Sequence, residues 1–215
     1  MSSSGFVVAL LGAESTGKTT LAAELQAALA TTGRRVGLVA EYLREFCNEA
    51  GRTPRQDEQL GIAREQTRRI ADAAATHDIV IADTTALMIA VYSDQVFGDT
   101  SLYAEASAAQ TACHLTLLPA LDLPWLPDGL QRDGPHVRDP VDAKVRAALG
   151  AAGVAYSIVA GHGPARLQAA LSAIDRALNP PPADANITTA SRWRWHCERC
   201  GDANCERQTL LPKQL

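Results

Sequence analysis

The segment that decides the fold is Phe6-Val-Val-Ala-Leu-Leu11 followed by Gly12-Ala-Glu-Ser-Thr-Gly-Lys-Thr19. Its first part is an unbroken apolar run, which is typical of a strand buried on both faces of a parallel sheet. Its second part fits the pattern G-x-x-x-x-G-K-[ST], in which glycine-rich backbone wraps phosphate groups at the start of a helix. An Ala/Leu-rich stretch that ends near Gly33 follows. The segment therefore predicts a strand, a phosphate-binding loop and a helix in succession.

The loop has expected roles in holding MgATP. Lys18 is expected to reach the β- and γ-phosphates, and Thr19 to hold Mg²⁺ through its hydroxyl. The alternative is a chance glycine turn with an exposed lysine, but the flanking strand and helix both favour the phosphate loop. The residues expected to bind ATP are Gly12, Glu14, Ser15, Thr16, Gly17, Lys18, Thr19 and Thr20.

The rest of the first 178 residues alternates strand and helix patterns. Alternation of this kind predicts parallel strands joined by right-handed helical crossovers. The expected fold class is therefore α/β, a three-layer sandwich around a five-stranded parallel sheet. Further strands are expected at 35–41, 78–83, 114–118 and 156–159, and further helices near 57–75, 85–96, 103–112, 141–150 and 164–178.

The composition changes after Leu178, which predicts three parts: a P-loop domain (1–178), a Pro-rich linker (179–190) and a Cys/Trp-rich tail (191–215). In the tail, the spacing C-x2-C-x4-C with a glycine after the first pair resembles a zinc knuckle turn. Three cysteines leave a fourth zinc ligand to be supplied from elsewhere. The alternative is three reduced thiols in a tail that packs through its tryptophans. The candidate zinc ligands are Cys197, Cys200 and Cys205.

Charge and composition exclude several classes of protein. The chain has 20 Lys+Arg and 24 Asp+Glu, a net charge of −4, which argues against general nucleic-acid binding. No apolar run approaches the roughly 18 residues that a membrane helix needs. No basic leader precedes the first apolar run, and the cysteines do not resemble a secreted disulfide framework. We expect a cytoplasmic protein that acts on a small molecule, without membrane or nucleic-acid partners; a homo-oligomer stays open.

Charged residues follow the predicted strands. Glu41 and Asp83 end the second and third strands, and carboxyl ends of parallel strands meet at the ligand-binding edge of a sheet. Asp83 is expected to hold Mg²⁺ or accept a proton, and Glu41 to bind a sugar hydroxyl or act as the base. The alternative is that one of them merely caps a helix. Arg132 and Arg138, after the fourth strand, are candidates to spread the charge of a transferred phosphoryl group, against the alternative of solvated surface arginines.

Together these pieces resemble the ribosylnicotinamide kinase domain of NadR-type proteins. Glu41-Tyr42 with Arg44-Glu45, Asp83-Thr84, and Pro124-Trp125 with Asp128-Gly129-Leu130 follow the phosphate loop in that family's order, over residues 5–178. The resemblance implies a P-loop kinase-like fold that transfers the γ-phosphoryl of MgATP to the ribose 5′-hydroxyl of nicotinamide riboside. Because the sequence opens on this loop, we expect none of the DNA-binding or adenylyltransferase regions of long family members.

The residue patterns and the resemblance together give the expected site residues. Those expected to bind the acceptor are Glu41, Tyr42, Arg44, Trp125 and Asp128, and those expected to be catalytic are Lys18, Glu41, Asp83, Arg132 and Arg138.

The sequence departs from the family pattern at three points. Ala40, and a position near Ala71, stand where well-known members carry aromatic residues that sandwich the pyridine ring, and Arg132 is displaced by one residue. Each stacked aromatic contributes about 1 kcal/mol beyond area burial. A P-loop kinase with another small-molecule acceptor is therefore an alternative. A third hypothesis is an ATP-binding regulatory module whose tail engages a partner.

Overall fold

The protein is described by a computed structural model that covers residues 4–126 and 134–180. Its centre is a five-stranded sheet in the order β2-β3-β1-β4-β5, and every neighbouring pair of strands is parallel. The expected α/β fold with a five-stranded parallel sheet is thus confirmed. The strands are β1 (Phe6–Leu10), β2 (Val36–Val39), β3 (Ile79–Asp83), β4 (Leu115–Pro119) and β5 (Ser157–Val159).

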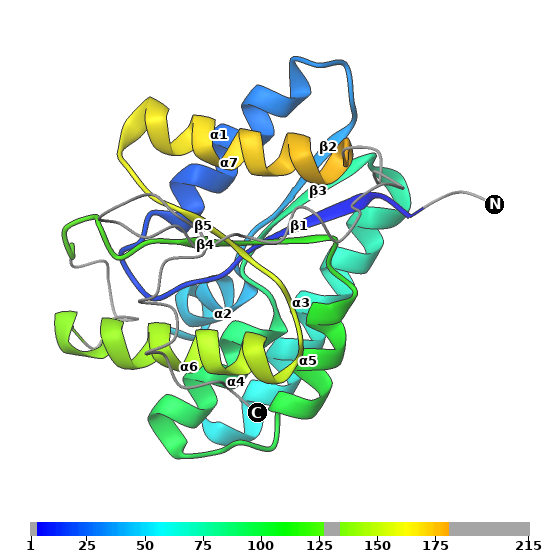
Figure 1. Ribbon diagram of the computed structural model, residues 1–215. Helices are drawn as coiled ribbons and strands as arrows, with labels where there is room; N and C mark the ends of the chain where they lie inside the picture. The colour runs from blue at the N-terminus through cyan, green and yellow to red at the C-terminus, as the bar shows by residue number, and fades with distance from the viewer. Residues whose placement is uncertain (1–3, 127–133, 181–215) are drawn as a thin grey trace, which may run out of the picture. The chain divides into compact units, whose positions relative to one another are not determined.

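Helices cover both faces of the sheet and complete the three layers (Figure 1). One face is covered by α1 (Lys18–Ala30) and α7 (Gly163–Leu178). The other carries α2 (Tyr42–Ala50), α3 (Gln56–Thr76), α4 (Ala86–Phe97), α5 (Tyr103–Thr111) and α6 (Arg138–Ala151), which follows the short 3₁₀ turn η2 (Pro135–Val137). None of the helices in the described ranges has the length and apolarity needed to cross a bilayer.

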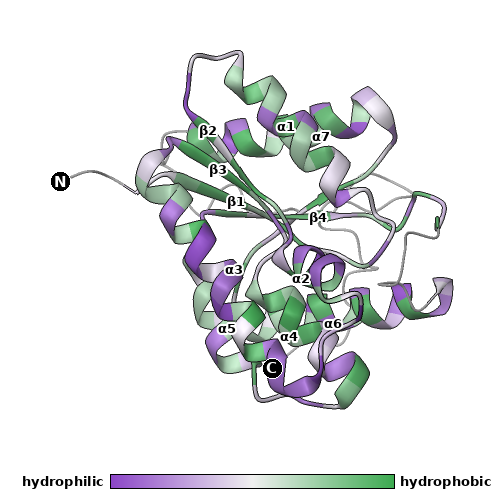
Figure 2. Ribbon diagram, turned by 180° about the vertical axis from the view of Figure 1, so that it is seen from behind, coloured by the Kyte–Doolittle hydropathy of each residue, from purple (hydrophilic) through white to green (hydrophobic). Residues whose placement is uncertain are grey.

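The apolar run of β1 is buried because the strand lies in the middle of the sheet. Alternate side chains point to opposite faces. Val8 and Leu10 pack with Leu21 of α1, whereas Val7 packs with Ala74 of α3. Figure 2 shows this pattern, with hydrophobic strands inside and hydrophilic residues along the outer side of α3. An element buried on both sides needs apolar residues at every position, as the sequence has.

Helix α2 is the element that the sequence did not predict. The strand expected at 35–41 ends at Val39, and Glu41 is the N-cap of α2 rather than the last residue of a strand. The helix ends at Ala50, and Gly51 caps it in the left-handed conformation (φ 66°) typical of a helix terminus. Of its residues only Cys47 is fully buried, but Tyr42, Leu43 and Phe46 recur with it at helical spacing and pack against the core, so the helix carries an apolar periodicity that the sequence interpretation missed.

The strand order places the loops that form the site. β1 lies between β3 and β4, and Leu10 is level with both Asp83 and Leu117. The segment after β1 therefore emerges beside the end of β3, at the point where the order of the strands reverses. The compact unit that contains the sheet ends at Asn179. The tail cysteines Cys197, Cys200 and Cys205 lie outside the described residues.

Candidate functional site

The phosphate loop joins β1 to α1 and is held from outside. Gly17 is the N-cap of α1 with φ 74°, and a Cβ there would come within 2.9 Å of Leu123 Cδ1, so the position requires glycine. Ser15 also has a positive φ (53°). Its hydroxyl donates to the Leu126 carbonyl (2.9 Å) and accepts from the Leu126 N–H (3.1 Å). The segment after β4 thus braces the loop in the strained geometry that phosphate binding needs.

Lys18 is the first residue of α1, and its ammonium group lies on the inner side of the loop. It donates to the carbonyls of Gly12 (2.8 Å) and Ala13 (2.9 Å). Burial lowers the pKa of Lys18, while the negative charges of Glu41 and Asp83 oppose this shift. The loop therefore holds a buried cation where phosphate oxygens would be bound.

Thr19 and Asp83 form a pair suited to Mg²⁺. The Thr19 hydroxyl donates to Asp83 Oδ2 at 2.6 Å. Asp83 is 2% exposed, and its Oδ1 is buried with no hydrogen-bond partner in the described part of the chain. Asp83 does not cap α4, because Thr85 occupies the N-cap and accepts from the Leu87 N–H (3.2 Å). A hydroxyl and an unpartnered carboxylate oxygen are the hard ligands that Mg²⁺ prefers.

The magnesium site would be completed by other ligands. Within residues 4–126 and 134–180, no group of three or more His, Cys, Asp or Glu side chains could hold a metal. Mg²⁺ is usually held by one or two protein groups together with substrate phosphates and water. The pair of Thr19 and Asp83 matches that arrangement.

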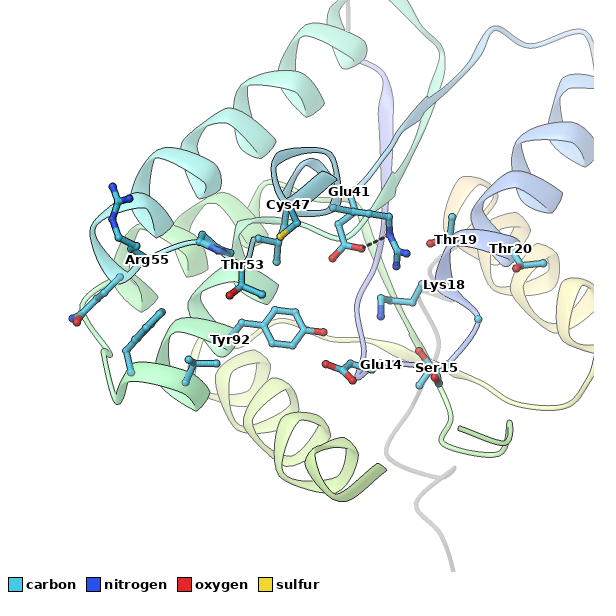
Figure 3. Close-up of a pocket in the computed structure, with 18 residues that line it drawn as sticks. Glu14, Ser15, Lys18, Thr19, Thr20, Glu41, Cys47, Thr53, Arg55 and Tyr92 are labelled. Carbon is cyan, nitrogen blue, oxygen red and sulfur yellow. Dashed lines mark ion pairs between the residues drawn. The ribbon is translucent and has the colours of Figure 1, made fainter. Parts of the chain in front are cut away.

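Glu41 lies opposite Lys18 across the cavity, as Figure 3 shows. Its side chain is 12% exposed, and Oε2 is 3.5 Å from the Arg44 Nε. Burial raises the pKa of Glu41, while the positive charge of Lys18 opposes the shift. A carboxylate with a raised pKa holds a proton more tightly than usual, which is the property required of a general base.

Lys18, Thr19 and Glu41 line one cavity of about 700 Å³ (Figure 3), whereas Asp83 adjoins it through its hydrogen bond from Thr19. The phosphate loop forms one end. The other end is apolar, with Leu43 and Cys47 from α2 and Tyr92, Val96 and Phe97 from α4. The loop between α2 and α3 forms the rim, with Thr53, Pro54, Arg55 and Gln56. The cavity thus joins a polar end suited to phosphates to an apolar, partly aromatic end suited to a flat ring.

The aromatic lining comes from α4 and not from the two positions where the resembled family carries its aromatic residues. Ala40 and Ala71 are exposed, and neither lines the cavity. Tyr92 and Phe97 of α4 supply the aromatic surface instead. Both lie in a buried apolar helix, where the pattern gives no sign of which side chains reach a cavity.

Two residues expected to bind the acceptor have other surroundings. The Tyr42 ring lies under the Arg69 guanidinium at 4.3 Å, a cation–π contact on the side of α2 that faces α3. Trp125 is half-buried. Neither lines the cavity, whereas Arg44 and Glu41 do. Asp128 lies outside the described residues.

Of the two arginine candidates, Arg138 begins α6, and Arg132 lies outside the described residues. Arg138 is buried, and its Nη1 donates to the Leu123 carbonyl (2.9 Å). Its Nε and Nη2 have no partners in the described part of the chain. Arg138 does not line the cavity, but it supports Leu123, which packs against Gly17 of the loop.

Sequence reasoning missed Arg166, which is buried near the start of α7. Its Nη2 donates to the Thr16 carbonyl in the phosphate loop (2.7 Å). Its Nη1 donates to Asp122 Oδ1 (2.7 Å) and to the Gly161 carbonyl (2.8 Å). Burial favours a higher pKa for Asp122, but hydrogen bonds from Arg166 and the Gly161 N–H hold that pKa below its ordinary value. No motif surrounds Arg166, because only the fold brings position 166 to position 16.

The turn after β3 is strained. Thr84 has φ 71°, a left-handed conformation that costs a β-branched residue on the order of 1–3 kcal/mol. Its N–H donates to the Leu10 carbonyl (3.1 Å), which fixes the turn to β1. Strain of this kind persists where the surrounding structure enforces it, and here it lies next to Asp83.

The fold and the site define a P-loop α/β domain. A sequence profile described as an AAA domain matches residues 7–166, and the chain belongs to that family. A search among curated proteins finds none that matches.

Solved structures with a similar fold include two of NadR protein. One is a complex with NAD and AMP-PNP (TM-score 0.63, 20% identity, 80% of this chain and 49% of that chain). The other is a complex with NR (TM-score 0.67, 18% identity, 82% of this chain and 52% of that chain). The chain spans about half the length of these NadR chains, and the likeness at this identity is one of fold.

Proposed function

We propose that the protein is an ATP-dependent phosphotransferase that transfers the γ-phosphoryl group of MgATP to a hydroxyl of a nucleoside-like acceptor. The proposed acceptor is nicotinamide riboside, at its ribose 5′-hydroxyl. The observation that carries the proposal is the single cavity that joins Lys18 and the phosphate loop to the apolar wall of Tyr92 and Phe97. The NadR structures with AMP-PNP and with NR support this choice of donor and acceptor.

The chain's residues have distinct parts in this reaction. The backbone of the loop and Lys18 bind the phosphates and neutralise their charge. Thr19 and Asp83 would hold Mg²⁺, which supplies further neutralisation of the phosphate oxygens. Glu41, on the opposite wall, orients the acceptor hydroxyl and takes its proton. The acceptor oxygen bonds to the γ-phosphorus, the bond from that phosphorus to ADP breaks, and Glu41 passes the proton to water.

The acceptor ring would lie at the apolar end, against Tyr92 and Leu43. One tyrosine face and aliphatic contacts replace a two-sided aromatic sandwich, because Ala40 and Ala71 offer no ring and do not line the cavity. This difference favours a second candidate, a kinase of the same mechanism with a different small-molecule acceptor. The wall selects for a flat apolar group but makes few directional contacts with it.

A panel of ribosides incubated with MgATP, with the products identified by mass, tests the proposal. We expect a product heavier by one phosphoryl group with nicotinamide riboside, and none with Lys18→Ala. Phosphorylation of another riboside alone would favour the second candidate. Tight ATP binding with no phosphorylated product from any acceptor would refute the kinase proposal and favour the regulatory-module hypothesis.

A further inference from the structure

We propose that Gln66 of α3 is a positioning residue that holds the two acidic residues of the site, Glu41 and Asp83, in their places beside the phosphate loop, where Thr19 and Asp83 would hold Mg²⁺. The inference rests on the proposed function only in taking Thr19 and Asp83 as the Mg²⁺ pair. Gln66 is fully buried (0% exposed) and does not line the cavity. It therefore acts through other residues and not by touching substrate.

One amide side chain satisfies three backbone groups. Gln66 Oε1 accepts from the Tyr42 N–H at 2.8 Å. Its Nε2 donates to the carbonyls of Ala40 and Thr84, both at 3.3 Å. The oxygen accepts one bond and the NH₂ group donates two, one from each of its hydrogens.

These three hydrogen bonds fix backbone groups next to both acidic residues. The Ala40 carbonyl and the Tyr42 N–H belong to the two peptide groups on either side of Glu41. The Thr84 carbonyl belongs to the residue that follows Asp83. β2 and β3 end side by side, with Asp83 as the last residue of β3 and Glu41 two residues after the end of β2. Gln66 therefore links the two strand ends beside both acidic residues.

The Thr84 bond has a further consequence for Asp83. Thr84 lies in the left-handed conformation (φ 71°), which a β-branched residue leaves readily unless it is held. Its N–H is held by Leu10 and its carbonyl by Gln66. The held turn keeps Asp83 Oδ2 on the Thr19 hydroxyl (2.6 Å) and leaves Oδ1 buried beside it. Gln66 thus fixes a metal-binding oxygen pair through the backbone.

Substitution at Gln66 can separate this role from general stability. Gln66→Met keeps length and burial but removes all three hydrogen bonds. Gln59→Met is the matched control, because Gln59 is a buried glutamine of the same helix that does not line the cavity. Gln66→Glu keeps the acceptor for Tyr42, and because a buried carboxyl group that faces two carbonyls favours its protonated form, it keeps at most one of the two donors. A neutral side chain adds no charge that would itself attract Mg²⁺, so weaker Mg²⁺ binding in this variant would come from the lost donor.

Isothermal titration calorimetry of the full chain measures ATP affinity in the presence of Mg²⁺ and in the presence of EDTA. The ratio of these two affinities measures how much Mg²⁺ strengthens ATP binding. We expect both Gln66 variants to lower this ratio about tenfold, as loss of a residue that orients a metal ligand typically does. ATP affinity in EDTA should stay within about twofold of wild type. Gln59→Met should leave the ratio unchanged.

An unchanged ratio in Gln66→Glu, or an equal fall of ATP affinity with and without Mg²⁺, overturns the inference. If Gln66→Met does not fold, the Gln66→Glu ratio alone decides the outcome. The readout is binding, so it stands even if no riboside is phosphorylated, and a failed kinase assay is distinguishable from a failed Gln66 assignment.

Discussion

Replacing Arg166 by methionine tests whether α7 holds the phosphate loop. The guanidinium is buried and makes close hydrogen bonds to Asp122 and to the carbonyls of Thr16 and Gly161. Methionine keeps the aliphatic volume and removes every donor. It leaves a carboxylate and three carbonyls, the third being that of Ala120 (3.4 Å), without this partner.

The expected cost follows from these contacts. Removing one partner of a fully buried ion pair costs about 3–5 kcal/mol. Because the Asp122 side chain is 30% exposed, water replaces part of the loss. Arg166→Met should therefore lower the free energy of unfolding by about 2–4 kcal/mol. For a domain of this size that corresponds to a fall in Tm of roughly 5–15 °C.

Urea unfolding followed by far-UV circular dichroism measures this change. The matched control is Arg176→Met, because Arg176 is an exposed arginine of the same helix and should cost less than about 0.5 kcal/mol. In a double-mutant cycle, Asp122→Asn should reduce the cost of Arg166→Met by about 1 kcal/mol or more. A loss below about 1 kcal/mol for Arg166→Met, or no coupling to Asp122, would refute the assigned role.

The same pair predicts a dependence on pH. The folded protein holds the pKa of Asp122 below its ordinary value through Arg166 and Gly161, against the effect of burial. A carboxyl group with a depressed pKa contributes stability above the unfolded value of about 3.9, and this stability is lost as the pH falls through the folded pKa. The stability gap between wild type and Arg166→Met should therefore narrow below about pH 4.

Three further predictions concern the charged residues of the site, Lys18, Asp83 and Glu41. Lys18→Ala should weaken ATP binding by at least about tenfold in calorimetry and abolish phosphoryl transfer, because it removes the buried cation of the loop; full activity in this variant would contradict its role. Asp83→Asn should keep ATP binding in EDTA and lose most of the gain from Mg²⁺, whereas an unchanged gain would place the metal elsewhere. Because burial raises the pKa of Glu41, kcat/KM should increase with pH around a pKa above the ordinary glutamate value of about 4.3. Glu41→Gln should lower activity and abolish this increase with pH. An unaltered pH profile in that variant would assign the base to another group.

Much of the fold could be predicted from local pattern. The apolar run 6–11 and the alternation of strands and helices gave the parallel sheet, because a strand covered on both faces must be apolar throughout. Helix α2 was not predicted, although its apolar residues recur at helical spacing, because it begins only three residues after β2 ends and its N-cap was included in the strand pattern of 35–41. For the same reason Glu41 was assigned to a strand end when it is a helix N-cap.

Asp83 and Tyr42 show which site residues could and could not be placed from the sequence. Asp83 could be placed because parallel strands end at one edge, and the structure puts it 2.6 Å from the Thr19 hydroxyl. Tyr42 was expected in the acceptor site, but its ring packs under Arg69. A residue's presence in a motif does not fix which way its side chain points, since that depends on the helix it begins and on the neighbours of that helix.

The sequence by itself determined the phosphate loop, Lys18, Thr19 and the sheet that carries them, because these depend on contiguous residues and on strand periodicity. Only the tertiary structure decided that Tyr92 and Phe97 line the cavity, that Gln66 bonds to the backbone on both sides of Glu41, and that Arg166 bonds to the phosphate loop. Those contacts join positions far apart in the chain through buried hydrogen bonds. The local sequence around either residue does not predict such a hydrogen bond, because the two residues come within bonding distance only after the helices have packed on the sheet.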